Sequence, residues 1–271
     1  MDEPLTVYGV QHTVSFEQER WWHRFTFGLV KPKKVNTANV SEINKHFKAL
    51  AANGVKKIGL EATSSREIKI PKVASNYDSN PHRYFKAITL RAQRAKLEVV
   101  DLENNLKSTA LSLLEHVFSN AFMYDKRRVF SSEEFSRIAK AYAADVVMRP
   151  LESSLVSKMP PKKILRVYDK MVDVVAHNFS TFDARTFYEL DHLMSRERSL
   201  EMANFARKQG VTHIVVGAAH AYDLQAHGHN VSYVNISDKE FGEIDDILSR
   251  RAILSHSTGL STFVEKLRKC A

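Results

Sequence analysis

Two histidines in this chain each follow an apolar, strand-like run through the same motif, Gly-x-x-His. Gly9 and His12 form the first copy near the start of the sequence, and Gly217 and His220 form the second far along it. A third apolar run ends in Glu61. Two imidazoles and a carboxylate can hold a divalent cation and leave positions open for water. The same set can also work without a metal, with one histidine as general base.

Five short apolar runs, separated by helix-like segments, are the elements that would position these residues. We predict strands at 5–10, 55–61, 97–102, 211–216 and 230–236. Alternation of strands with helices favours an α/β fold with a mainly parallel central sheet flanked by helices. The carboxyl ends of parallel strands meet at one edge, where such sheets bind ligands. We therefore expect His12, Glu61 and His220 to share one site at this edge.

The glycine of each motif has a mechanical interpretation. A glycine lets the backbone turn sharply where a strand gives way to a loop, or lets a ligand approach the backbone closely. We therefore expect Gly9 and Gly217 to contact the substrate, together with Tyr222, which lies just beyond the second motif. Trp21 lies on a helix predicted at 15–25 and could form a wall of the same cleft.

A mostly helical stretch interrupts the alternation between the third and fourth predicted strands. We expect residues 1–271 to form a single α/β domain, in which about 104–182 are a helical insertion that caps the sheet edge. Such a cap would cover the cleft and set the choice of substrate. Within it, Ser131 and Glu134 have the spacing of a capping box, which marks a helix start. Further helices are predicted at 41–52, 80–96, 239–251 and 261–269.

A long helix is predicted from Asp183, as its N-cap, to Gly210, as its terminator. Arg198 lies in the middle of the apolar face of this helix, which is formed by Phe187, Leu190, Met194, Met202 and Phe205. Arg198 precedes Gly210 by twelve residues, which is about 18 Å of helix. Because the strand that follows returns about 20 Å, we expect Arg198 to lie level with Gly217 and beside His220.

The guanidinium of Arg198 is costly on an apolar face unless it is paired. One interpretation is that Arg198 orients Glu61, or binds an anionic group of the substrate in a bidentate manner. The other is that it pairs with an acid near the same face of its own helix, such as Asp191 or Glu201. The two interpretations are compatible with each other.

Other residues of suitable chemistry are weaker candidates. Asp101 and Glu103 close the third predicted strand and could join the site. His227 and His229 resemble a metal-binding pair, but they precede a strand, so we expect them in a loop at the opposite edge of the sheet. His192 lies opposite the Arg198 face of the long helix, and we expect its side chain to be exposed.

The composition excludes several classes of protein. Hydrophobic residues make up 44% of the chain and charged residues 26%, which is ordinary for a globular protein. No run of about 18 apolar residues occurs, so we expect no transmembrane helix, and the first residues lack the pattern of a secretory signal. Cys270 is the single cysteine, which excludes an intrachain disulfide and a cysteine-cluster metal site. These features favour a cytoplasmic protein whose metal, if any, is held by histidine and carboxylate.

The chain carries a formal net charge of +9. A basic surface can attract phosphate backbones, so association with nucleic acid is one alternative. The basic residues are spread over separate short clusters, however, and no nucleic-acid-binding motif organises them.

The two Gly-x-x-His motifs, Glu61 and Arg198 together resemble the pattern of the TraB/PrgY/Tiki superfamily. The stretch from Arg196 to Ala221 is the most similar part, whereas the first motif differs from the Gly-Thr-x-His form common in that family. The chain also lacks the membrane helices of many members. The resemblance implies an α/β domain in which these residues cluster. It implies metal-dependent peptide hydrolysis, as in Tiki proteins, ester hydrolysis with an activating histidine, as in erythromycin esterases, or haem binding, as in ChaN-like proteins.

The sequence therefore predicts a hydrolase, with a metal-dependent peptidase as one form of it. His12, Glu61 and His220 would hold Mn²⁺, Co²⁺ or Zn²⁺ or activate water directly, and Arg198 would steady Glu61 or the developing oxyanion. The substrate would be a peptide or a small molecule. The main alternative is a protein that binds haem or another small ligand without catalysis, and the other is the nucleic-acid-associated protein.

Overall fold

The computed structural model describes residues 3–11, 37–61, 81–124, 128–148, 160–236, 242 and 258–270. The chain divides into two compact units. Unit 1 comprises Met1–Leu102 and Ala206–Glu240, and unit 2 comprises Glu103–Phe205 and Phe241–Ala271. Of the predicted site residues, Glu61 and His220 belong to unit 1 and Arg198 belongs to unit 2, so each unit is described by itself.

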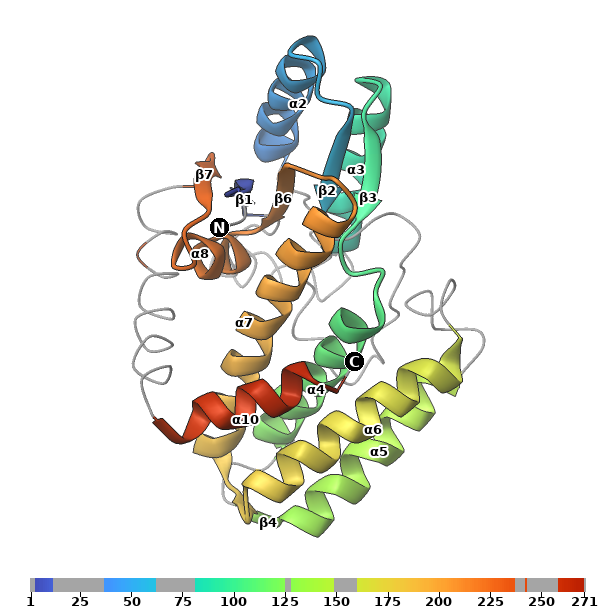
Figure 1. Cartoon of the computed structure of the whole chain (residues 1–271), viewed down its shortest axis with the longest axis vertical. Helices are drawn as coiled ribbons and strands as arrows, with labels where there is room; N and C mark the ends of the chain where they lie inside the picture. Colours follow the sequence, from blue (N-terminus) through green and yellow to red (C-terminus); the bar gives the residue numbers. More distant parts are fainter. Residues whose placement is uncertain are drawn as a thin grey trace, which may run out of the picture. The chain divides into compact units, whose positions relative to one another are not determined.

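Unit 1 is built on a five-stranded sheet in the order β3-β2-β6-β1-β7 (Figure 1). Every pairing in it is parallel. The strands are β1 (Thr6–Val10), β2 (Lys57–Leu60), β3 (Glu98–Asp101), β6 (His213–Gly217) and β7 (Asn230–Val234). None of these strands extends more than one residue beyond its predicted range. The predicted α/β fold with a parallel central sheet flanked by helices is therefore confirmed.

Helices cover both faces of this sheet because neighbouring residues of a strand point to opposite sides. Tyr8 and Val10 belong to a buried core with residues of α2 (Thr37–Ala52) and α3 (Pro81–Arg94). Gly9 faces the other way, toward Ala221 of α8 (Ala218–Gln225). Helices α2 and α3 thus pack on one face, and α8 packs on the opposite face.

The strand order reverses direction between β1 and its neighbour β6. From β1 the chain continues to β2 on the β6 side, whereas from β6 it continues to β7 on the far side of β1. Open α/β sheets bind ligands at such a switch point, outside the carboxyl ends of the strands. In this sheet those ends are followed by Gln11, Glu61, Ala218 and Asn235.

Gly9 is a packing residue within β1. A Cβ added there would lie 2.7 Å from the Ala221 Cβ and 2.8 Å from the Tyr233 ring. We expect Gly9→Ala to lower the free energy of unfolding by about 1–3 kcal/mol, because the core must shift to admit the methyl group. Urea denaturation would measure the loss. Gly242→Ala is the control, since among the described residues no atom lies within 4 Å of a Cβ there, and equal stability of both variants would contradict the packing role.

Unit 2 consists mainly of helices. They are α4 (Leu106–Tyr124), α5 (Ser132–Met148), α6 (Pro161–Asn178), α7 (Ala184–Lys208, which ends in unit 1) and α10 (Thr258–Arg268). Two short strands, β4 (Phe130–Ser131) and β5 (Thr181–Phe182), pair antiparallel. The predicted helical insertion at 104–182 falls between the third and fourth strands of the sheet and lies inside this unit. The unit itself also takes in 183–205 and 241–271.

The core of unit 2 contains a group of stacked phenylalanine rings. The ring centroids of Phe135 and Phe182 lie 4.2 Å apart, those of Phe118 and Phe135 lie 5.6 Å apart, and those of Phe182 and Phe187 lie 5.7 Å apart. Such pairs contribute beyond the area they bury, and here they join α4, α5, β5 and α7.

The predicted helix ends have the expected chemistry. The Glu134 N–H donates to Ser131 Oγ at 3.2 Å, and the Ser131 N–H donates to the Glu134 carboxylate at 3.0 Å, which forms the predicted capping box. Asp183 accepts the Thr186 N–H at 2.7 Å at the start of α7. Gly210 follows this helix with a positive φ of 69°, a conformation that glycine adopts without a steric penalty. The helix predicted at 15–25 lies outside the described residues.

Candidate functional site

The carboxylate of Glu61 is bound to the start of α8. Glu61 follows β2 directly, and its own N–H donates to the Val215 carbonyl of the neighbouring strand at 3.0 Å. Its Oε2 accepts the Gly217 N–H at 2.6 Å. Glu61 is only 7% exposed. A carboxylate is stabilised at a helix N-terminus by the N–H groups and the helix dipole, so this contact holds the side chain in place.

His220 stands in the first turn of α8 and faces the same carboxylate. Its Nε2 lies 3.7 Å from Glu61 Oε1, and both side chains are largely buried. This distance is within the range of an ion pair but longer than a hydrogen bond, and catalytic contacts are often long before a substrate binds. The structure thus brings together Glu61, Gly217 and His220, at the edge of the sheet where the sequence places them.

Gly9 lies within β1 and makes no turn, whereas β6 passes directly into α8 at Gly217. Gly217 has φ −57° and ψ 150°, a conformation open to other residues, and its N–H is engaged by Glu61. The space beside Gly9 is filled by Ala221 and Tyr233. Tyr222 is half-buried on α8. Contact of these three positions with a substrate remains a prediction.

Arg198 pairs with acids that lie outside its own helix. Its Nε is 2.8 Å from Glu103 Oε1, and its Nη1 is 2.5 Å from Glu115 Oε2. The expected partners on α7, Asp191 and Glu201, are not the acids in these two ion pairs. Arg198 belongs to unit 2, whereas Glu61 and His220 belong to unit 1. Its action on the Glu61 carboxylate therefore stays a prediction.

His12 lies outside the described residues, and so does Trp21. Within the described residues, no group of three His, Cys, Asp or Glu side chains is placed to hold a metal ion. Glu61 and His220 supply one carboxylate and one imidazole. A metal centre here would need a third ligand from outside the described ranges, which is the place that the sequence gives to His12.

The remaining candidates are distributed over other parts of the fold. Asp101 ends β3, and Glu103 pairs with Arg198. His192 is 8% exposed and lies edge-on to Tyr188 at 4.2 Å, so the expectation of an exposed side chain was wrong. Ser195 and Ser199, at helical spacing from His192 on the same side of α7, are buried as well, so this side of the helix is covered. The His227 Nδ1 lies 2.7 Å from the Asp223 carbonyl.

His229 is part of the opposite edge of the sheet, as predicted. Its Nδ1 accepts the Leu5 N–H at 3.2 Å, next to the amino end of β1, and its Nε2 lies 3.4 Å from Arg207. Burial lowers the pKa of this imidazole, and the charges of Arg207 and His227 lower it further. The neutral ring is the form that accepts the Leu5 N–H.

The His229 contact predicts a loss of stability in acid. Because the pKa of His229 is lower in the folded chain than in the unfolded chain, the unfolded state takes up the proton first. The contribution of the neutral His229 ring to the free energy of unfolding is complete above about pH 6.5, the ordinary pKa of histidine, and is lost as the pH falls through the pKa of the folded state. We expect His229→Gln to cost about 1 kcal/mol at neutral pH and to flatten the acid limb of a stability–pH curve measured by urea denaturation. An unchanged acid limb would contradict this role.

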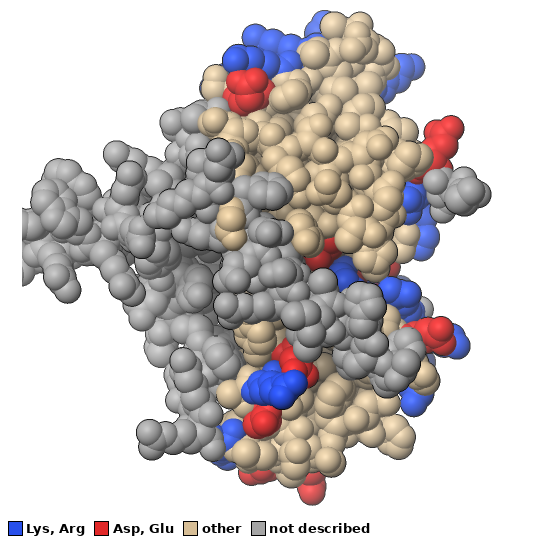
Figure 2. Space-filling model, turned by 90° about the vertical axis from the view of Figure 1, so that its left-hand side faces the viewer, with Lys and Arg blue, Asp and Glu red and all other residues tan. Residues whose placement is uncertain are grey.

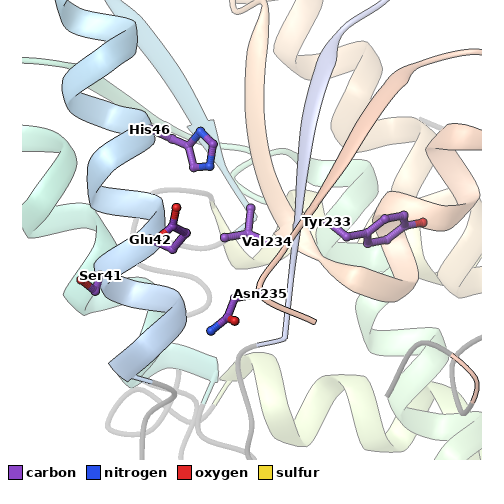
Figure 3. A pocket seen from close by; sticks show the side chains of 6 residues that line it. All are labelled: Ser41, Glu42, His46, Tyr233, Val234 and Asn235. Carbon is purple, nitrogen blue, oxygen red and sulfur yellow. The ribbon is translucent and has the colours of Figure 1, made fainter. Parts of the chain in front are cut away.

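A groove of about 520 Å³ that sequence reasoning missed lies at the carboxyl end of β7. Figure 3 shows the side chains that line it, from α2 and from the end of the strand: Ser41, Glu42, His46, Tyr233, Val234 and Asn235. The sequence pattern gave no signal for it, since Asn235 lies inside the predicted strand 230–236, whereas the observed β7 ends at Val234.

The basic side chains do not gather into one patch on the face drawn in Figure 2, where blue groups alternate with red ones. Several described lysines and arginines have acidic partners, including Lys140 with Asp173 at 2.6 Å and Arg185 with Glu189 at 2.8 Å. On this face, the described basic side chains therefore form no continuous track for a phosphate backbone.

Comparison with known proteins found no matching family model, no similar curated protein and no similar solved structure. The resemblance to the TraB/PrgY/Tiki pattern is therefore carried by the residues of this chain alone. Within the described ranges, no helix combines the length and the apolar character needed to cross a membrane.

Proposed function

We propose that this protein is a hydrolase in which His220, oriented by Glu61, activates water against an ester. The observation that carries the proposal is the Glu61 carboxylate, which is bound by the Gly217 N–H on one oxygen and faces His220 with the other. A base held by a buried carboxylate is the arrangement that orients histidine in hydrolytic enzymes of unrelated folds.

In this proposal, each ring nitrogen of His220 has its own role. Nε2 faces Glu61 Oε1, so a carboxylate there favours the tautomer with its proton on Nε2. Nδ1 is then the nitrogen that takes a proton from water while the water oxygen attacks the ester carbonyl. The Glu61 charge stabilises the imidazolium that forms. The same proton passes to the departing alkoxide as the C–O bond breaks, and the products are a carboxylic acid and an alcohol.

An ester suits this pair better than a peptide. General acid–base catalysis by one positioned side chain contributes about 10²–10⁴-fold. An alkoxide is a better leaving group than an amide nitrogen, so the same rate enhancement gives a faster reaction with an ester than with a peptide. A divalent cation, if His12 completes its ligand set, would lower the pKa of bound water and widen the range to peptides.

Hydrolysis of a panel of esters and peptides, before and after treatment with a chelator, tests the proposal. Ester hydrolysis that survives the chelator supports the His220–Glu61 pair acting without metal. Activity that is lost and then restored by Mn²⁺, Co²⁺ or Zn²⁺ supports the metal form. Hydrolysis of no member of the panel would contradict the proposal.

Glu61→Gln separates the charge of this residue from its shape. The amide oxygen can still accept the Gly217 N–H, but the side chain no longer stabilises an imidazolium. We expect kcat for ester hydrolysis to fall by at least about tenfold while the melting temperature changes little. Glu98→Gln is the control, because Glu98 is an exposed acid at the amino end of β3. Equal kcat for the two variants would show that Glu61 has no catalytic part.

A further inference from the structure

The groove beside β7 has the geometry of a small-molecule site. It opens between the first turns of α2 and the carboxyl end of β7. In Figure 3, Glu42 and His46 lie on the side of α2 that faces the strand, and Val234 and Asn235 lie opposite them. The Tyr233 ring leaves the strand on the other side, where its hydroxyl donates to Gln225 at 3.1 Å.

The charge of Glu42, the acidic side chain among the described residues that line the groove, is balanced by a neighbouring lysine. The Glu42 carboxylate has the Lys45 ammonium 2.7 Å away. The hydrogen bond from Lys45 lowers the pKa of Glu42, so this side chain is ionised and its charge is balanced. The His46 ring leans on the Tyr8 ring with their centroids 5.0 Å apart, which restricts its orientation.

Asn235 holds a backbone conformation that costs energy. Its φ is +51°, in the left-handed region that residues other than glycine seldom adopt. Asparagine tolerates this region better than most residues. Backbone strain of this kind concentrates at ligand sites, where the surrounding structure maintains it. Here it sets the amide directly after the strand end, beside the groove.

These features select a class of ligand. A phosphate or a carboxylate would meet the Glu42 anion, and an ammonium ligand would compete with Lys45 for it. A large apolar ligand would find little beyond Val234 to cover it. A carboxylate, an imidazole and an amide together both donate and accept hydrogen bonds. We propose that the groove binds a small uncharged ligand with several hydroxyl groups, a sugar or a polyol.

The sheet register relates this groove to His220 and Glu61. Val10 of β1 pairs with Gly217 on one side and with Val234 on the other. Gly217 and Val234 therefore lie at the same level of the sheet, two strand spacings or roughly 10 Å apart. The groove lies on the face covered by α2, whereas His220 is on α8, which covers the other face. This second step rests on the proposed function: the substrate is an ester whose alcohol half is the sugar or polyol, held in the groove, and whose acyl half passes around the carboxyl edge of the sheet toward His220.

Binding to the full-length chain tests the groove without any need for activity. Monosaccharides and sugar alcohols would be titrated by calorimetry and by saturation-transfer NMR, with inorganic phosphate and a quaternary ammonium salt beside them. We expect at least one polyol to bind. Asn235→Gly removes the amide and relieves the positive φ, and His46→Phe keeps the ring against Tyr8 but removes its nitrogens. Each should weaken binding by about fivefold or more.

Asn230→Ala is the matched control, since it removes an exposed asparagine amide from the amino end of the same strand. Its affinity should equal that of the unchanged protein. The groove proposal is overturned if no polyol binds, if phosphate or the ammonium salt binds in place of the polyols, or if both groove variants bind as tightly as the control.

The two experiments distinguish failure of the groove proposal from failure of the proposed function. Polyol binding without ester hydrolysis retains the groove and removes the proposed function. Hydrolysis of simple esters without polyol binding retains the function and removes the groove. If both hold, acyl esters of the bound polyol should have a lower KM than simple alkyl esters, and Asn235→Gly should abolish that advantage. An equal KM for the two kinds of ester would remove the link between them.

Discussion

His220→Ala is expected to lower kcat for ester hydrolysis by about 10²–10⁴-fold, because it removes the base that takes the proton from water. The fold should survive the change. Glu61 keeps its hydrogen bond from the Gly217 N–H at 2.6 Å, and the lost imidazole was only in ion-pair range of the carboxylate. Steady-state hydrolysis of an ester substrate, read together with the melting temperature, measures both quantities.

His227→Ala is the matched control for this variant. His227 lies seven residues further along the chain, at the other edge of the sheet, with its ring against the Asp223 carbonyl. We expect its removal to leave kcat nearly unchanged. The pH profile gives an independent readout: the limb that reports a histidine acting as base should disappear in His220→Ala and persist in His227→Ala. Equal kcat values for the two variants would show that His220 is not the base.

The strands and caps of this chain could be predicted because their signals are local. The short apolar runs at 5–10, 55–61 and 211–216 predict the ends of β1, β2 and β6 to within two residues. The capping box at Ser131 and Glu134 needs only a spacing of three. Parallel pairing then relates residues far apart in the sequence, since it brings Glu61, which follows β2, to the carboxyl end of β6. The meeting of Glu61 and His220 follows from that rule rather than from either motif.

The partners of Arg198 could not be predicted in the same way. An arginine on an apolar helix face indicates that an acidic partner is close to it, but the sequence does not show which acid is that partner. Neighbours on the same helix were the natural candidates, whereas the structure supplies Glu103 from the residues before α4 and Glu115 from α4 itself. Which acid reaches the guanidinium depends on how α4 and α7 pack within unit 2, and helix periodicity does not determine that.

Glycine and the groove show two other limits. The pattern Gly-x-x-His suggested a turn at Gly9, yet this residue is glycine because Ala221 and Tyr233 occupy the space of a side chain. The groove depends on the left-handed φ of Asn235 and on the approach of α2 to the end of β7. Neither is visible in an alternation of apolar and polar residues.

Arg198→Met is expected to lower the free energy of unfolding by about 2–4 kcal/mol. Removing one member of a buried ion pair costs about 3–5 kcal/mol because the opposite charge loses its compensation. The loss here should be somewhat smaller, since the Glu115 side chain is 22% exposed and can gain water. Two carboxylates then repel each other in place of sharing one guanidinium. Urea denaturation of the variant, with the transition followed in unit 2, measures the effect.

Two comparisons identify the cause of this loss. Arg185→Met, on the same helix, removes an arginine that is 84% exposed and paired with Glu189, so it should leave the free energy of unfolding nearly unchanged. Adding Glu103→Gln and Glu115→Gln to Arg198→Met should recover much of the stability, because no carboxylate remains to repel the other. If Arg198→Met is no more costly than Arg185→Met, the ion pairs are not structural. If it instead lowers kcat at a temperature where the variant is folded, Arg198 also acts on the Glu61 carboxylate, as its place in the sequence predicts.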